Sequence, residues 1–149
     1  MKAIIQLVKA ATLTTQDYST QTIEKGMVIF VGFTHQDTLT IIDQMLQKIL
    51  SLRVFADAQG KTNLSLFDIQ GALLCVPNFT LYADVSGSRR PSFSDAAKPE
   101  VALPWFAYLQ TRLTHLYPNA KFGKFGADMS VVVHNDGPFN LILSSDESK

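Results

Sequence analysis

Cysteine is almost absent from this chain of 149 residues, in which Cys75 is the single example. One cysteine excludes an internal disulfide and favours a reducing, cytoplasmic compartment. Cys75 lies in the apolar run 72–76, which has no basic neighbour to activate a thiol, so we expect it in the core. No apolar run approaches the ~20 residues needed to cross a membrane, which predicts a soluble protein without a membrane partner.

An excess of charge of either sign is also missing, since 13 basic residues balance 13 acidic residues. A neutral chain is not expected to hold nucleic acid through bulk charge alone, although a local basic patch remains compatible with it. The sequence lacks a Gly-x-Ser-x-Gly elbow, a phosphate-binding loop and a Gly-x-Gly-x-x-Gly fingerprint. These absences give no support to a common serine hydrolase or to a nucleotide cofactor, and we expect no cofactor.

Hydrophobic residues are abundant, at 46% of the chain with 10 phenylalanines, and predict one well-filled domain over residues 1–149. Helical spacing of apolar residues predicts one helix from Thr38, with Asp37 as its N-cap, and a second from Pro99 or Pro104 to Leu116. The remaining patterns predict an α/β fold with mixed β-sheets and these two main helices. Extended segments are predicted at residues 3–12, 18–23, 27–31, 73–82, 129–134 and 139–143.

Two His-x-Asp segments, His35-Gln36-Asp37 and His134-Asn135-Asp136, contain the side chains that titrate near neutral pH or bind metals. Their convergence would make a metal site or an acid–base pair. The alternative is structural, with Asp37 capping a helix and His134 ending a strand. No His-x-x-x-His pair accompanies them, and we favour the structural interpretation with no metal site.

Main-chain groups of two other segments offer a different chemistry. In Pro77-Asn78-Phe79-Thr80-Leu81, the N–H groups of Phe79 and Thr80 and the Thr80 hydroxyl can polarise an ester carbonyl. In residues 135–140, Gly137-Pro138 reads by itself as a hairpin turn between two strands. A cis Gly-Pro bond would instead direct two carbonyl oxygens the same way, where they can grip an ammonium group.

Arg89 and Arg90 form a compact basic loop beside Pro91 and Phe93. Two adjacent guanidinium groups can clamp phosphate through paired hydrogen bonds. The alternative is an ordinary solvated loop, which is the favoured interpretation when these residues are considered by themselves.

The two segments resemble the active-site motifs of D-aminoacyl-tRNA deacylases, which usually read Ser-Gln-Phe-Thr-Leu and Asn-x-Gly-Pro-Val-Thr. The resemblance covers nearly the whole chain and includes segments 31–35, 48–53, 60–65, 81–84, 90–93 and 125–129. It implies the family fold and a homodimer. It also implies hydrolysis of the ester between a D-amino acid and the tRNA 3′ adenosine, and of glycyl esters on tRNA.

The resemblance assigns roles residue by residue. Phe79 and Thr80 would be the catalytic positions, while the terminal 2′-hydroxyl of the tRNA assists the chemistry. Gly137-Pro138 of one subunit would enter the site of the other and hold the substrate's amino group without leaving space for an L side chain. The expected substrate-binding residues are therefore Pro77, Asn78, Asn135, Gly137, Pro138 and Phe139, and the expected tRNA-binding residues are Arg89 and Arg90.

Five positions depart from the family pattern. Pro77-Asn78 stands for Ser-Gln, Phe139-Asn140 stands for Val-Thr, and Leu7 occupies a position that usually holds arginine. The alternatives are a family member with relaxed chirality that acts on L-aminoacyl-tRNA, or a dimer that binds aminoacyl-tRNA without hydrolysing it. In the family, a cis Gly-Pro bond accompanies the D-specific filter and a trans bond the relaxed one.

Overall fold

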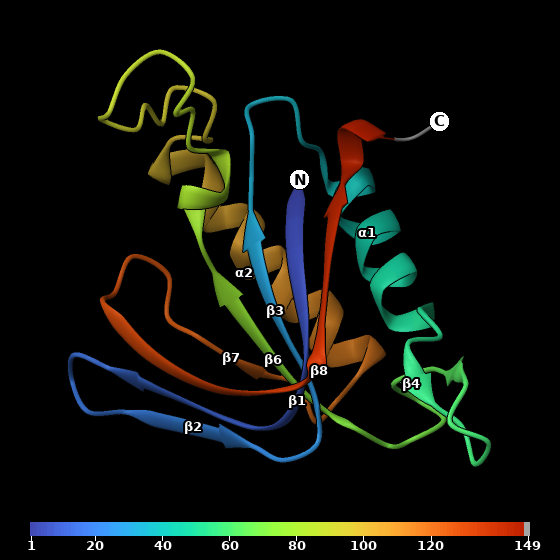
Figure 1. The fold of residues 1–149 in the computed structure, drawn as a ribbon. Helices are drawn as coiled ribbons and strands as arrows, with labels where there is room; N and C mark the ends of the chain where they lie inside the picture. Colours follow the sequence, from blue (N-terminus) through green and yellow to red (C-terminus); the bar gives the residue numbers. More distant parts are fainter. Residues whose placement is uncertain (148–149) are drawn as a thin grey trace.

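The computed structural model describes residues 1–147, which form a six-stranded sheet with helices α1 and α2 behind it (Figure 1). Strand order is β2-β1-β3-β6-β7, and β8 pairs with the opposite edge of β1. The helices are α1 (Leu39–Ser51), α2 (Pro99–Leu116) and the short 3₁₀ helices η1 (Phe79–Tyr82) and η2 (Ser145–Glu147). The strands are β1 (Lys2–Thr15), β2 (Thr20–Ile23), β3 (Gly26–Gly32), β4 (Phe55–Ala56), β5 (Thr62–Leu64), β6 (Ala72–Pro77), β7 (Lys121–Phe122) and β8 (Met129–Ser144).

The sheet is mixed, as the sequence predicts. Strand β1 runs antiparallel to β2, β3 and β8, whereas β3 and β6 are parallel. All of β3 except Phe30 is buried, which explains its uninterrupted apolar sequence. Strand β1 instead alternates buried and half-buried residues along most of its length, because helices cover only one of its faces fully.

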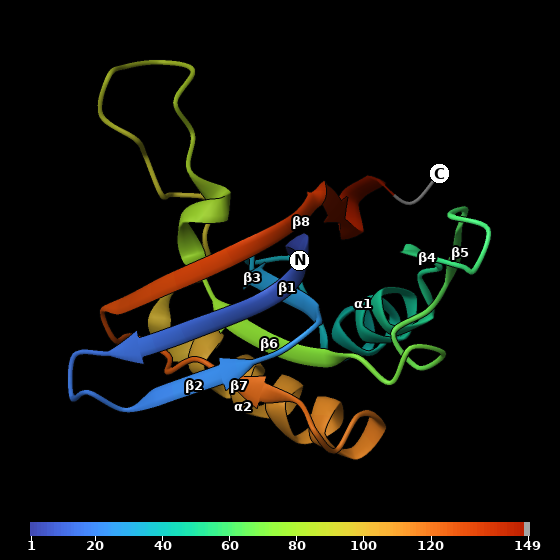
Figure 2. The same ribbon diagram turned by 60° about the horizontal axis from the view of Figure 1, so that its bottom comes forward.

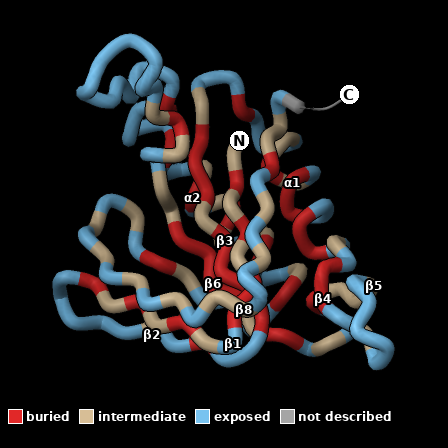
Figure 3. The backbone as a smooth tube through the Cα atoms, in the orientation of Figure 1, coloured by how far each residue is buried: buried red, intermediate tan, exposed pale blue. Residues whose placement is uncertain are grey.

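Two hydrophobic clusters lie on opposite faces of this sheet. The larger joins β1, β3 and β6 to both helices and includes Phe106 and Leu46, which are almost completely buried. The smaller cluster contains Val8, Leu13 and Val28 on the other face. Figure 3 shows the buried segments concentrated along β3, β6 and the inner side of α1, while the loop at the upper left is exposed.

Helix α1 begins at Leu39, one residue later than predicted. The N-cap is Thr38, whose hydroxyl accepts a hydrogen bond from Ile41 N–H at 3.2 Å. The prediction of Asp37 as N-cap was wrong, because tertiary structure uses its carboxylate elsewhere. Asp37 is buried, pairs with the Met1 ammonium group and accepts a hydrogen bond from Thr34 N–H at 2.8 Å.

Helix α2 begins at Pro99, the earlier of the two predicted starts, and Pro104 lies inside it. Its buried residues Ala102, Phe106, Leu109 and Leu113 face the larger cluster. Within residues 1–147, no helix has the length and apolar character needed to cross a membrane.

The predicted strand over residues 73–82 was too long, because the sheet ends at Pro77 and η1 follows. Pro77 has no N–H to continue the ladder, and Asn78 then caps the new helix through its side chain. The two strands predicted around a turn at 135–138 were also wrong. Residues Met129–Ser144 form one long strand that follows β1 along its length, with an irregularity in the middle.

Candidate active site around residues 77–80

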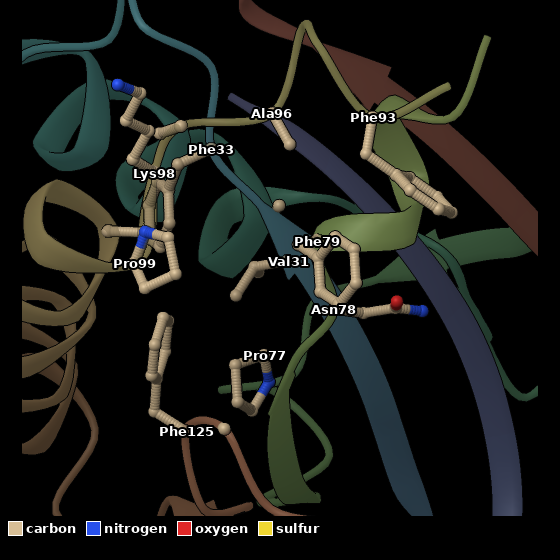
Figure 4. A pocket seen from close by; sticks show the side chains of 14 residues that line it. Val31, Phe33, Pro77, Asn78, Phe79, Phe93, Ala96, Lys98, Pro99 and Phe125 are labelled. Carbon is tan, nitrogen blue, oxygen red and sulfur yellow. The ribbon is translucent and has the colours of Figure 1, made fainter. Parts of the chain in front are cut away.

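An apolar cavity of about 370 Å³ opens where β6 leaves the sheet. Its walls come from the ends of β3 and β6, the start of η1, the segment that leads into α2, and the loop before β8. Figure 4 shows Val31, Pro77, Pro99 and Phe125 converging on this space, while the Asn78 amide points away from it. The lining residues are Val31, Gly32, Phe33, Pro77, Asn78, Phe79, Phe93, Ala96, Ala97, Lys98, Pro99, Ala102, Phe125 and Gly126.

Asn78 anchors the turn from β6 into η1. Its N–H donates to Val31 O at 2.7 Å, which ties the turn to the end of β3. Its side-chain Oδ1 accepts from Thr80 N–H at 3.2 Å and also from the Thr80 hydroxyl. Both Thr80 donors expected at the substrate are therefore held by Asn78 in this structure, and the Thr80 oxygen keeps its lone pairs as acceptors.

Phe79 contributes both a free donor and an aromatic wall. Within residues 1–147 its N–H, at the first position of η1, has no hydrogen-bond partner. The residue is 58% exposed, and its ring meets Phe93 edge to face, with ring centroids 5.1 Å apart. The pair connects the mouth of the cavity to the loop that precedes α2.

Arg89 and Arg90 lie on that same loop, which projects away from the body of the protein (Figures 1 and 2). Two backbone hydrogen bonds of 2.8 Å between Asp84 and Ser92 close the loop at its base. The Ser86 N–H donates to the Asp84 carboxylate and holds the pKa of this group below its usual value. Both arginines are exposed, so their guanidinium groups are open to an anionic partner.

Gly137 and Pro138 lie away from this cavity, since none of its lining residues comes from 135–140. Their peptide bond is cis, both residues are exposed, and Gly137 has φ +127°, a value that disfavours any residue with a Cβ. The segment is a bulge within β8 and not the predicted hairpin turn. One chain therefore does not bring the two sequence motifs together.

Three of the departures from the family pattern have structural explanations. Leu7 is buried in the larger hydrophobic cluster, at 6% exposure. Phe139 is half-buried and packs against the same cluster, so its bulk is directed into the protein. The Pro77 ring lies beside Gly123, where an added Cβ would stand 3.2 Å from Pro77 Cδ. The apolar side chains at these positions thus have apolar surroundings.

The histidine segments do not form a common site within the described residues 1–147, which contain no group of three or more ligands placed to hold a metal. His35 Nε2 lies 2.7 Å from Ser94 O, and Asp37 is occupied by the N-terminus. Cys75 is fully buried, as expected, and burial raises the pKa of its thiol.

Comparison with known proteins decides the family. The sequence profile described as D-Tyr-tRNA(Tyr) deacylase matches residues 4–144. The chain belongs to this deacylase family. A protein named D-aminoacyl-tRNA deacylase from Chromohalobacter salexigens is 42% identical over 145 residues, covering 97% of this chain and 100% of the relative. One of the same name from Exiguobacterium sibiricum is 42% identical over 143 residues, covering 96% and 99%.

Solved structures agree with the deacylase fold. A protein titled c-Myc DNA Unwinding Element Binding Protein is 36% identical with a TM-score of 0.91, and the match covers 97% of this chain and 99% of that one. A probable eukaryotic D-amino acid tRNA deacylase has a TM-score of 0.86 at 13% identity, covering 95% and 97%, which supports the fold alone. The α/β fold and family inferred from the sequence are thus confirmed.

Sequence reasoning missed most of the cavity wall in this deacylase. Phe93 and Lys98 come from the segment that leads into α2, Phe125 comes from the loop before β8, and the two segments meet only after folding. Phe93 and Phe125 do lie in segments that resemble the family, which was the available signal. Asn140 was recognised only as a departure from the pattern, and its hydrogen bonds to Gln6 and Asn135 were not foreseen.

Proposed function

We propose that this protein hydrolyses the ester bond of D-aminoacyl-tRNA, and of glycyl-tRNA, to release tRNA and the amino acid. The observation that carries the proposal is the apolar, aromatic cavity beside the free N–H of Phe79. Full-length relatives named for this activity support it. Because the substrate is an aminoacyl-tRNA, we place the activity in the cytoplasm.

Main-chain groups provide the chemistry in this proposal. The N–H of Phe79 donates to the ester carbonyl as negative charge develops on its oxygen. Thr80, whose hydroxyl donates to Asn78, accepts a hydrogen bond from the substrate. The rings of Phe79, Phe93 and Phe125 provide flat apolar surfaces for the terminal base, as in other proteins that stack single-stranded nucleotides. The attacking water is activated by the terminal 2′-hydroxyl of the tRNA, so the site needs no side-chain base, metal or cofactor.

Gly137 and Pro138 act in the site of a second subunit. Two observations support this arrangement: both residues are exposed, and neither of them lines the cavity of their own chain. Strand β8 pairs within residues 1–147 only with β1, and its exposed Val132 and Ile142 give a homodimer an apolar surface to cover. Arg89 and Arg90 bind phosphates of the tRNA 3′ end.

Turnover of purified protein with D-tyrosyl-, L-tyrosyl- and glycyl-tRNA tests the activity. The proposal expects cleavage of the D and glycyl esters, little cleavage of the L ester, and no loss in the presence of a chelator. Equal cleavage of D and L esters would overturn D-selectivity. The absence of any turnover would identify a binding protein, and loss of activity in chelator would restore a metal mechanism.

Mixed dimers test the shared site. Gly137→Ala and Asn78→Ala would each be inactive alone, because each dimer then has two defective sites. Random exchange of subunits makes half of the dimers mixed, and one of their two sites is intact, so activity returns to about a quarter of the wild-type value. A site built within one chain predicts no recovery on mixing.

A further inference from the structure

The Gly137-Pro138 segment is a loop extruded from an otherwise continuous strand. Gln6 pairs with Asn140 and Val8 pairs with Asn135, so four residues of β8 face only Leu7 on β1. A second shift in register follows between Val8 and Ala10. The backbone hydrogen bonds between β1 and β8 therefore cannot hold the loop in place. Leu7 is paired in register with no residue of β8.

Side-chain amides close this gap. Asn135 Nδ2 donates to Leu7 O and to Asn140 Oδ1, each at 3.0 Å. Gln6 Nε2 donates to the same Asn140 Oδ1 at 3.2 Å. The two N–H groups of Asn135 and the two acceptor sites of Asn140 Oδ1 are thus all used. The hydrogen bonds join both ends of the loop to each other and to β1.

Other attachments of the loop are weak. Lys9 Nζ lies 4.0 Å from Asp136 Oδ1, and the two side chains are 60% and 41% exposed. Such a solvated pair adds little rigidity. The Leu7 side chain is buried in the core and gives the loop no polar contact. Phe139 is half-buried and packs against the larger cluster, but this apolar contact does not join the two ends of the loop to each other, as the hydrogen bond between Asn135 and Asn140 does.

We propose that Gln6, Asn135 and Asn140 form an amide clamp that positions Gly137-Pro138 and thereby sets the discrimination between D and L substrates. The inference rests on the proposed function for its effect on selectivity. Asn135 and Asn140 are positioning residues in it, because the N–H groups of Asn135 and the Oδ1 of Asn140 bond within the clamp. A loosened clamp lets the loop retreat from the substrate's α-carbon and admit an L side chain.

The directions of the hydrogen bonds provide a matched pair of variants. Asn140 uses only its oxygen, so Asn140→Asp keeps both contacts. Asn135 uses only its N–H groups, so Asn135→Asp places a carboxylate against Leu7 O and Asn140 Oδ1. We expect Asn140→Asp to keep the wild-type ratio of D to L kcat/KM. Asn135→Asp and Asn140→Leu should lower this ratio about tenfold, mainly through faster L cleavage, because each loses hydrogen bonds.

Hydrogen–deuterium exchange of peptides from the loop gives a second measurement that does not need catalysis. Exchange should be faster in Asn135→Asp and Asn140→Leu, and unchanged in Asn140→Asp and in the exposed control Asn119→Ala. Wild-type exchange in Asn140→Leu, or equal effects of the two aspartate variants, would overturn the clamp. If the wild-type protein does not cleave D-aminoacyl-tRNA, the proposed function fails while exchange still decides whether the clamp exists.

Discussion

Replacing Phe79 with alanine should separate the stability of this protein from its activity. Phe79 is 58% exposed. Fully burying a phenylalanine gains about 1.5–3 kcal/mol, and about two-fifths of that gain, roughly 0.6–1.2 kcal/mol, is at stake here. The edge-to-face contact with Phe93 adds about 0.5–1.5 kcal/mol. The expected loss in free energy of unfolding is therefore about 1–3 kcal/mol. Phe106 is 1% exposed, and Phe106→Ala should lower the free energy of unfolding by about 3–5 kcal/mol.

Phe79→Ala should also lower the activity of the protein that remains folded. If a substrate base stacks on this wall, its loss is worth about 1–3 kcal/mol, or roughly a 5- to 150-fold drop in kcat/KM. The assays are urea unfolding and hydrolysis of D-tyrosyl-tRNA by the folded variant. Phe93→Ala should act in the same direction, and the double variant should show a coupling free energy because the rings are in contact.

Two results would refute this reasoning. A destabilisation of Phe79→Ala as large as that of Phe106→Ala would show that the ring is part of the core. Unchanged kcat/KM in a fully folded variant would show that the cavity wall does not contact the substrate. Phe79→Leu is the control, because it keeps apolar bulk at the mouth but removes the flat ring.

Three further predictions concern the rest of the molecule. Asp37→Asn breaks the buried pair with the Met1 ammonium and should cost about 3–5 kcal/mol, seen as a fall in Tm of about 6–20 °C in calorimetry. Tyr82→Phe removes a buried hydroxyl that has no partner within residues 1–147, and it should leave urea stability unchanged or raise it by about 1 kcal/mol; a clear loss would mean that the hydroxyl is paired. The Arg112 guanidinium hydrogen-bonded to Asp43 holds the pKa of that carboxyl below its usual value. The ion pair therefore stabilises the fold fully at pH values above the ordinary carboxyl pKa of about 3.9, and this stabilisation is lost as the pH falls through the lower pKa of the folded state. The difference in free energy of unfolding between wild type and Asp43→Asn should therefore shrink in acid.

The sequence predicted some elements well and others poorly, for identifiable reasons. Strand β3 and the apolar stripe of α1 were recognised because local periodicity reports which faces are buried. The error at β8 arose because Gly-Pro normally marks a turn, whereas β1 is long enough to pair with both halves of β8. The error at Asp37 arose because its partner, the Met1 ammonium, is distant in sequence.

The candidate site was also predicted only in part. Phe79, Thr80, Gly137 and Pro138 were identified through their resemblance to the family motifs. The sequence did not show that Asn78 accepts a hydrogen bond from the Thr80 hydroxyl. Asn78 is one methylene shorter than the glutamine usual at this position, and the effect of that difference depends on the geometry of the turn. The clamp formed by Asn135 and Asn140 likewise depends on a register shift between two strands, which no local pattern encodes.

The sequence by itself determined the family of this protein, its α/β class and its two helices, because motifs and apolar periodicity are properties of neighbouring residues. Only the tertiary structure decided that the two motifs lie apart in one chain, that a cavity adjoins Phe79, and that Asn135 hydrogen-bonds to Leu7 and Asn140 across the loop at Gly137-Pro138. These features depend on strand register and on contacts across more than a hundred residues of chain. Such contacts form only when distant strands pair in the sheet, and the identities of the side chains alone do not specify them.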